Sequence, residues 1–209
     1  EHFMLNILGR RNSSNVQKVL WACDELHLPY EREDIGGSFG RNHSAKYLAM
    51  NPNGTIPTLI DDGRTLWESN AIVRYLCESR EPHGLLPKDA WSIALAQQWM
   101  DWQQTILAPA IRPLFWNLIR TSPQNQDLEA ISTGRNNTEA ALRILDEHLS
   151  QHRYVAGEHF SFGDIPVGVM AYRWFNLDIQ RAALPSLEHW YRGLTARQAY
   201  EDNVMMTIT

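Results

Sequence analysis

Pro57 is the residue that most restricts how this chain can fold, because it stands directly before a short β-type run, Thr58-Leu59-Ile60. Proline has no backbone N–H to give to a sheet ladder, so the sequence places it at a strand start or a bend. A cis Ile56-Pro57 bond would turn the chain sharply and leave the N–H and C=O of Ile56 facing solvent. An extended, peptide-like ligand could then pair with those two groups as an added strand.

A hairpin and a helix are predicted after this proline. Two short β-type runs, 58–60 and 65–67, alternate around Asp61-Asp62-Gly63, which is a strong hairpin signal. Ser69 precedes an apolar helical pattern and is interpreted as the N-cap of a helix reaching about Arg80. A helix N-terminus suits a carboxylate, and the neighbouring Glu68 could hold an ammonium, so the pair matches an amino-acid head group. A plain hairpin and capped helix is the alternative.

The segment before Pro57 has the pattern strand, helix, strand. The strands are expected at 4–8 and 30–35, and the helical period runs from Val16 to about His27. Such a βαβ unit implies a parallel pair of strands. A βαβ unit followed by ββα is the order of a small thioredoxin-like sheet.

The rest of the chain reads as helix. Prolines and a glycine in 81–88 predict a linker at 82–88, between an N-terminal α/β domain (1–81) and an all-α helical-bundle domain (89–209). Helices are expected over 91–120, kinked by Pro109 and Pro113, and over 128–149. Ser161 and Asp164 form a predicted capping box that opens a buried helix, and two shorter helices follow Pro185 and Thr195.

Composition excludes several classes of function. The 209 residues carry a net charge of −5, spread evenly, so no nucleic acid or membrane partner is expected. With no run of 18 apolar residues and no signal-peptide pattern, the expected compartment is the cytoplasm. Cys23 and Cys77 fall on apolar helix faces and are expected to be buried thiols. His148 and His152 have metal-binding spacing, but no third ligand lies nearby, so no metal site is expected.

These motifs together resemble a cytosolic glutathione S-transferase of bacterial type, over nearly the whole chain. The motifs stand in the family's order and spacing: Ser13-Ser14-Asn15-Val16-Gln17-Lys18-Val19, Asn51-Pro52 with Gly54–Leu59, Glu68-Ser69, and Ser161 with Gly163-Asp164-Ile165. The serine-type theta, phi and zeta branches are nearest at the first helix. The resemblance implies a detoxifying transferase that takes glutathione as co-substrate, needs no metal and forms a homodimer.

The resemblance also assigns a residue to the thiol. A free thiol titrates near about pH 8.5, and a hydroxyl donating to the sulfur at a helix N-terminus favours the anion. Ser13 is the first candidate for that hydroxyl, Ser14 is the alternative, and Asn15 is a candidate helper. A purely structural role for both serines, as caps of the first helix, is the other interpretation.

The remaining parts of the tripeptide are assigned by the same likeness. Ile56 pairs through its backbone with the cysteinyl part, and Glu68 with Ser69 binds the γ-glutamyl head. Asn42 and His43 stand where the family often has a histidine or lysine pair for the glycine carboxylate, although a solvent-facing His43 is equally consistent. Thr55 replaces a common glutamine or lysine, so its contact with glutathione is expected to be weak.

A small hydrophobic electrophile is the expected second substrate. One helix face could line its pocket, namely Trp102, Ile106, Pro109, Arg112 and Trp116. Arg10 either reaches the same cleft or lies in solvent. Two alternatives remain open: a glutathione-dependent disulfide reductase or peroxidase, and a non-catalytic protein-binding module with the same fold.

Overall fold

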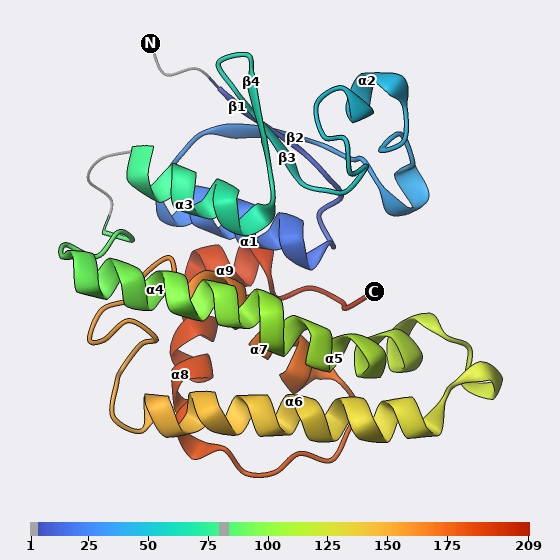
Figure 1. Cartoon of the computed structure of the whole chain (residues 1–209), viewed down its shortest axis with the longest axis vertical. Coiled ribbons are helices and arrows are strands. Elements are labelled where there is room, and N and C mark those ends of the chain that lie inside the picture. Colours follow the sequence, from blue (N-terminus) through green and yellow to red (C-terminus); the bar gives the residue numbers. More distant parts are fainter. Residues whose placement is uncertain (1–3, 80–83) are drawn as a thin grey trace.

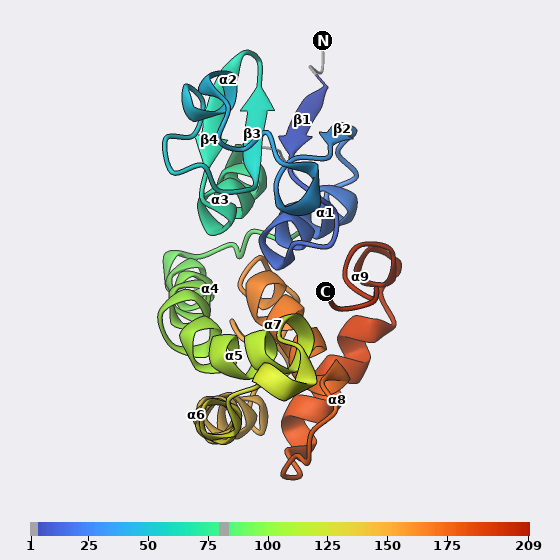
Figure 2. The ribbon, with the colours of Figure 1, turned by 90° about the vertical axis from the view of Figure 1, so that its right-hand side faces the viewer.

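The computed structural model describes residues 4–79 and 84–209. An N-terminal unit built on a sheet lies above an all-helical C-terminal unit (Figures 1 and 2). The predicted fold class, a thioredoxin-like domain followed by a helical bundle, is confirmed. The linker at 82–88 stays a prediction, because residues 80–83 lie outside the described residues.

Four short strands make one mixed sheet in the order β2-β1-β3-β4. Their bounds are β1 Leu5–Leu8, β2 Tyr30–Glu33, β3 Thr58–Asp61 and β4 Arg64–Trp67. β1 and β2 are parallel, as the βαβ pattern predicted, and β3 runs antiparallel to both β1 and β4. The predicted hairpin turn is Asp62-Gly63, whose φ angles of 50° and 74° are those of a tight two-residue turn.

Three helices complete the N-terminal domain: α1 Ser14–Glu25, α2 Ala45–Leu48 and α3 Ser69–Ser79. α1 and α3 lie between the sheet and the C-terminal helices, and α2 stands apart from them (Figure 1). Every residue of α1 from Val16 to Cys23 is buried. Cys23 and Cys77 are both buried thiols, as predicted.

The prediction that Ser69 caps α3 is wrong by one residue. The carbonyl of Glu68 accepts the first helical hydrogen bond, from the N–H of Ile72 at 2.9 Å, so Glu68 holds the cap position and Ser69 begins the helix. The φ angle of Glu68 is 71°, a region that residues other than glycine seldom occupy. This backbone turns the chain abruptly from β4 into α3 and sets both side chains at the same corner.

The C-terminal domain contains α4 Ala90–Trp102, α5 Ala108–Phe115, α6 Leu128–Leu149, α7 Asp164–Asn176, α8 Pro185–Thr195 and α9 Gln198–Asn203. The helix predicted over 91–120 is one helical run, interrupted by π-helical turns at Gln103–Leu107 and Trp116–Arg120. The first turn comes just before Pro109, whose ring and missing N–H disturb the regular bond to residue 105. The irregularity predicted near Pro109 and Pro113 is therefore present, in the form of wider π-helical turns.

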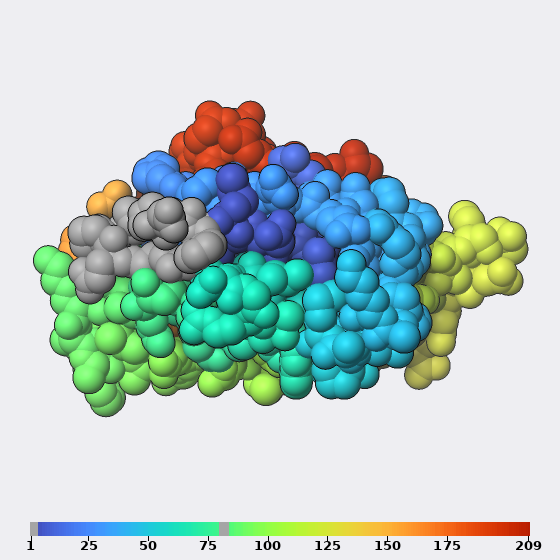
Figure 3. Space-filling model, turned by 90° about the horizontal axis from the view of Figure 1, so that it is seen from above, coloured from blue at the N-terminus to red at the C-terminus, as the bar shows by residue number. Residues whose placement is uncertain are grey.

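One hydrophobic core joins the two domains. The ring of Trp21 on α1 lies 5.6 Å from that of Phe160 and 4.7 Å from that of Tyr200, both in the C-terminal half. The space-filling view shows the N-terminal domain, blue to cyan, flanked by green α4 and red C-terminal helices (Figure 3). α1 is thus the central element of the molecule, and its N-terminus opens toward α5 and α7.

Candidate active site

Two adjoining cavities lie between α1 and the run from α4 to α5. We call the first the serine cavity; it has a volume of about 420 Å³ and is lined by Arg10, Ser13, Ser14, Asn15, Gln103, Ala108, Ile111, Arg112, Phe115, Trp116, Arg120, Met170 and Arg173. The second, the glutamate cavity, has a volume of about 400 Å³ and is lined by Asn15, Lys18, Glu68, Ser69, Gln103, Gln104, Ala108, Pro109, Arg112 and Pro113. Four residues line both cavities, so the two form one continuous interdomain site.

Ser13 holds the N-cap position of α1, but its hydroxyl does not cap the helix. Its carbonyl accepts the first helical bond, from the N–H of Gln17 at 2.9 Å. Within the described residues, the Ser13 hydroxyl makes no hydrogen bond. A donor therefore stands in the serine cavity at the positive end of a 12-residue helix, where an anion is stabilised. Ser14 and Asn15 line the same wall.

Lys18 is a functional candidate that sequence reasoning missed. Its side chain is only 3% exposed, and its ammonium donates to Ser69 Oγ at 3.4 Å, Asn70 Oδ1 at 3.2 Å and Gln103 Oε1 at 3.0 Å. Burial and the charge of Arg173 lower the pKa of Lys18 to about 7, although Glu68 acts to raise it. The available signal was a lysine directly before the apolar run Val19–Cys23 of α1.

Glu68 and Ser69 lie together in the glutamate cavity, as the head-group prediction requires. Ser69 is buried, and its hydroxyl oxygen accepts a hydrogen bond from the Lys18 ammonium. The carboxylate of Glu68 and the first free N–H groups of α3 thus offer one negative and one positive partner at a single corner. An amino-acid head group carries the two opposite charges.

The backbone of Ile56 is held in position by its neighbours. The Ile56-Pro57 bond is cis, as predicted. The Thr55 carbonyl accepts hydrogen bonds from Tyr47 Oη at 2.6 Å and from Asn51 Nδ2 at 2.9 Å. In the part of the chain that the structure describes, neither the N–H nor the C=O of Ile56 makes a hydrogen bond. Both groups therefore stay available for a ligand strand.

Three predicted contacts lie apart from the two cavities. Asn42 donates through Nδ2 to the carbonyl of Gly54 at 2.7 Å, which gives it a structural task in the turn before Ile56. His43 is exposed with its ring against Gly54, whose φ of 63° and lack of Cβ allow that approach. Thr55 is also exposed. The structure brings these residues to the Ile56 turn rather than to the walls of either cavity.

Only part of the predicted co-substrate pocket is found at the serine cavity. Arg10, Arg112 and Trp116 line the serine cavity, but Trp102 lines neither cavity; its half-buried ring packs edge-on against Trp99 at 5.0 Å. The π-helical turn after residue 102 rotates the residues before it relative to those after it. A regular helical period therefore wrongly placed Trp102 on the same face as Arg112 and Trp116. Arg120 and Arg173, which also line the cavity, were missed, because a helix pattern does not reveal which distant helix completes a wall.

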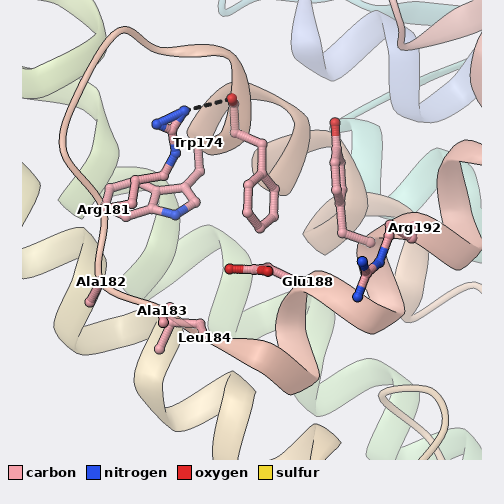
Figure 4. Close-up of a pocket in the computed structure, with 9 residues that line it drawn as sticks. Trp174, Arg181, Ala182, Ala183, Leu184, Glu188 and Arg192 are labelled. Atoms are coloured by element: carbon pink, nitrogen blue, oxygen red, sulfur yellow. Dashed lines mark hydrogen bonds between the residues drawn. The ribbon is translucent and has the colours of Figure 1, made fainter.

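A third hollow, of about 420 Å³, lies at the other end of the C-terminal domain, between α7 and α8 (Figure 4). Arg181 there donates to the carbonyl of Phe175 at 2.7 Å, and Glu188 and Arg192 come from α8. None of the predicted site residues lines it.

Among residues 4–79 and 84–209, no group of three or more His, Cys, Asp or Glu side chains is placed to hold a metal ion. The rings of His148 and His152 stack on each other, 4.3 Å apart. No helix in the same ranges has the length and hydrophobicity needed to span a bilayer.

Comparison with known proteins gives a consistent result. Residues 12–79 match the family described as Glutathione S-transferase, N-terminal domain, and residues 128–193 match Glutathione S-transferase, C-terminal domain. The chain is 40% identical to Glutathione S-transferase GstB of Escherichia coli, over 99% of this chain and 100% of that protein. It is 28% identical to Glutathione S-transferase 3 of Zea mays, over 96% and 93% of the two chains. It is also 42% identical to the crystal structure of the theta class glutathione S-transferase of Xanthomonas axonopodis pv. citri with glutathione bound, with a TM-score of 0.95 and coverage of 98% and 99%.

Proposed function

This chain belongs to the glutathione S-transferase family, and from that premise we propose that it binds reduced glutathione between its domains and transfers the glutathionyl sulfur to a small electrophile. The observation that carries the proposal is the uncommitted hydroxyl of Ser13 at the N-terminus of α1, on the wall of the serine cavity. The alternative, that Ser13 serves only as a cap, is disfavoured because its hydroxyl makes no cap bond.

Each part of the tripeptide has a proposed partner. The γ-glutamyl head occupies the corner of Glu68 and Ser69, and the cysteinyl part pairs with the backbone of Ile56. The glycine carboxylate extends toward Asn42 and His43, past Thr55. The supporting observations are the open corner at the start of α3 and the unpaired N–H and C=O of Ile56.

Ser13 is proposed to stabilise the thiolate by donating its hydroxyl hydrogen to the sulfur, with Asn15 as a helper; Ser14 is the alternative to Ser13. The helix dipole acts in the same direction. Lowering a thiol pKa by two units requires roughly 2.7 kcal/mol, at about 1.36 kcal/mol per unit, which one charge-assisted hydrogen bond and a helix terminus together can supply. The thiolate then attacks an electrophilic carbon without needing a general base.

Ser13→Ala should leave glutathione binding largely intact and raise the pKa of the bound thiol by about one to two units, because the donor to the sulfur is lost. Ultraviolet titration of the bound thiolate measures this pKa, and calorimetry measures the binding. Ser14→Ala is the matched control and should titrate like the wild type. An unchanged titration in Ser13→Ala would move the role to Ser14 or Asn15.

The electrophile is expected to be small, with an apolar part against Ile111, Phe115 and Met170. Retention on a glutathione-affinity resin separates this function from that of a non-catalytic binding module. A panel of halogenated aromatic, epoxide, hydroperoxide and disulfide substrates separates it from a reductase or peroxidase. A cytoplasmic homodimer acting in detoxification is expected from the family alone.

A further inference from the structure

The walls of the serine cavity carry an unusual charge. Four arginines line it, Arg10, Arg112, Arg120 and Arg173, and its described lining residues include no aspartate or glutamate. They come from separate elements: the loop after β1, α5, the π-helical turn after it, and α7. The cavity that is expected to receive the second substrate is therefore strongly cationic.

None of these four cations is paired with an aspartate or glutamate side chain among the described residues. In the part of the chain that the structure describes, none of them forms an ion pair, whereas Arg32, Arg41, Arg74, Arg143 and Arg197 all do. Arg10 donates through Nη1 to Asn12 Oδ1 at 2.7 Å, but its buried Nε has no partner. Arg120 donates to the carbonyl of Thr209 at 3.2 Å. Most of the guanidinium donors thus remain available to a bound molecule.

The arginines also lower one another's pKa. Burial and the charges of Arg120 and Arg10 lower the pKa of Arg173 to about 10. Burial and the charge of Arg120 lower the pKa of Arg10 as well. Like charges held close together in a partly buried cavity raise the free energy of the empty site, and a bound anion relieves that cost.

Glutathione alone does not account for four arginines. Its γ-glutamyl carboxylate is assigned to the glutamate cavity and its glycine carboxylate to the Ile56 turn. The thiolate needs only one or two donors, which Ser13 and its neighbours provide. The remaining wall combines cations with apolar surface from Ile111, Phe115 and Met170, which suits a molecule that has an apolar body and an acid group.

We infer that the second substrate is an organic acid, an electrophile whose carboxylate is bound by the arginines of the serine cavity while its apolar part packs between α5 and α7. This inference rests on the proposed function and specifies the substrate class of the same site. In the reaction, the thiolate sulfur forms a bond to the electrophilic carbon, and a halide leaves with the electrons of the broken carbon–halogen bond. The thiol proton goes to solvent, and no oxidant or reductant takes part.

A matched pair of electrophiles tests the inference: 4-chloro-3-nitrobenzoate and its methyl ester. Both react at the same carbon, but only the first carries a negative charge. For each, kcat/KM with saturating glutathione is divided by the uncatalysed rate constant with glutathione, which removes the difference in intrinsic reactivity. The wild-type enzyme should favour the acid by about tenfold or more, as expected for one charge-assisted hydrogen bond, and the preference should shrink with added salt.

Two variants identify the groups responsible. Arg112→Gln and Arg173→Gln should each reduce the ratio of the acid's normalised kcat/KM to that of the ester by about tenfold. Arg192→Gln is the control, because it removes one positive charge from the exposed surface of α8, at the third hollow (Figure 4). It should behave like the wild type.

A second measurement uses only the wild-type enzyme, so it does not depend on how the variants fold. Unreactive 3-nitrobenzoate should compete with the methyl ester, whereas the neutral 3-nitrobenzamide should compete at least tenfold more weakly. Equal turnover of acid and ester, or equal inhibition by the two analogues, would overturn the inference while leaving the transferase function intact. Failure to conjugate either electrophile, together with no uptake of glutathione, would overturn the proposed function and this inference with it.

Discussion

Lys18 shows how strongly one residue's surroundings can change its chemistry. Its amine lies in the core of the molecule, bonded only to uncharged oxygens of Ser69, Asn70 and Gln103. These bonds connect the start of α3 to the π-helical turn, so Lys18 positions both walls of the glutamate cavity. Burial lowers the pKa of Lys18 from its ordinary value of 10.5 to about 7.

The Lys18 pKa makes stability depend on pH. Between about pH 7 and 10.5 the unfolded chain holds a proton that the folded chain has released, so the free energy of unfolding rises with pH across this window. The contribution is lost as pH falls through 7. Lys18→Met should therefore reduce the rise between pH 7 and 9 by up to about 2.7 kcal/mol, at 1.36 kcal/mol per unit.

Urea unfolding at pH 7 and pH 9 measures the effect. Lys46→Met, which changes an exposed lysine of α2, should keep the wild-type pH dependence. If Lys18→Met also kept it, the amine of Lys18 would have to remain charged in the folded protein.

At this scale the sequence predicted motif residues better than isolated ones. Ser13, Asn15, Glu68 and Ser69 stand in short motifs beside helix starts, and the structure brings all four to the interdomain site. Lys18 stands inside the first-helix motif but was given no role, and Arg173 carries no local motif; the roles of both depend on which distant helices pack against them. Such residues become visible only once the tertiary contacts are known.

At the scale of elements, the start of α7 depends on one buried carboxylate. Asp164 accepts hydrogen bonds from the N–H groups of Val155 and Ser161, at 3.1 and 3.0 Å, and from Trp190 Nε1 at 2.9 Å. The predicted capping box is wrong about the cap: Gly163, not Ser161, holds the N-cap position of α7, and no side chain caps the helix. Of the two hydrogen bonds of a capping box, only the bond from the N–H of Ser161 back to the Asp164 carboxylate is present. Burial raises the pKa of Asp164 to about 6, although these bonds oppose the shift.

Asp164→Ala should lower the free energy of unfolding by at least about 3 kcal/mol, because it leaves four buried donors, the three above and the hydroxyl of Ser161, without a partner. Asp89→Ala is the comparison: Asp89 caps α4 by accepting from the N–H of Ser92 at 3.0 Å, but at the surface, so its loss should cost much less. Chemical denaturation of both variants gives the two values. Similar losses would mean that burial adds nothing to the contribution of Asp164.

Element boundaries were predictable where a local signal marks them. The length of α6 and the β3–β4 turn match the prediction, since Asp-Gly turns and helix caps act within a few residues. The π-helical turns were not predicted, because a proline indicates disturbance without saying whether the helix bends or widens. That difference decided which aromatic side chains line the serine cavity.

At the scale of the whole molecule, the two domains share one core. Trp21 is fully buried, and its ring touches Phe160 and Tyr200 of the C-terminal half. Trp21 and Leu194 also pack closely against Gly168 of α7: a Cβ added there would stand 2.9 Å from the Trp21 ring and 2.8 Å from Leu194. The two domains should therefore unfold together.

Trp21→Ala should lower the free energy of unfolding by about 3–5 kcal/mol, as removal of a buried aromatic ring does. Its near- and far-ultraviolet circular dichroism transitions should still coincide. Trp91→Ala, which changes a tryptophan that is 75% exposed, is the control and should cost little. Two separate transitions in the wild-type protein would show that the domains are energetically independent.

The encasement of α1 has a consequence for how such an enzyme can diversify. Because every residue of α1 from Val16 to Cys23 is buried, we expect the first turn of the helix to keep the same position with and without a bound ligand. Ser13, the proposed activator of the sulfur, is thus carried by a deeply buried helix, while the surfaces proposed to select the second substrate belong to α5 and α7. Substitutions on those two helices can therefore change substrate selectivity without moving Ser13.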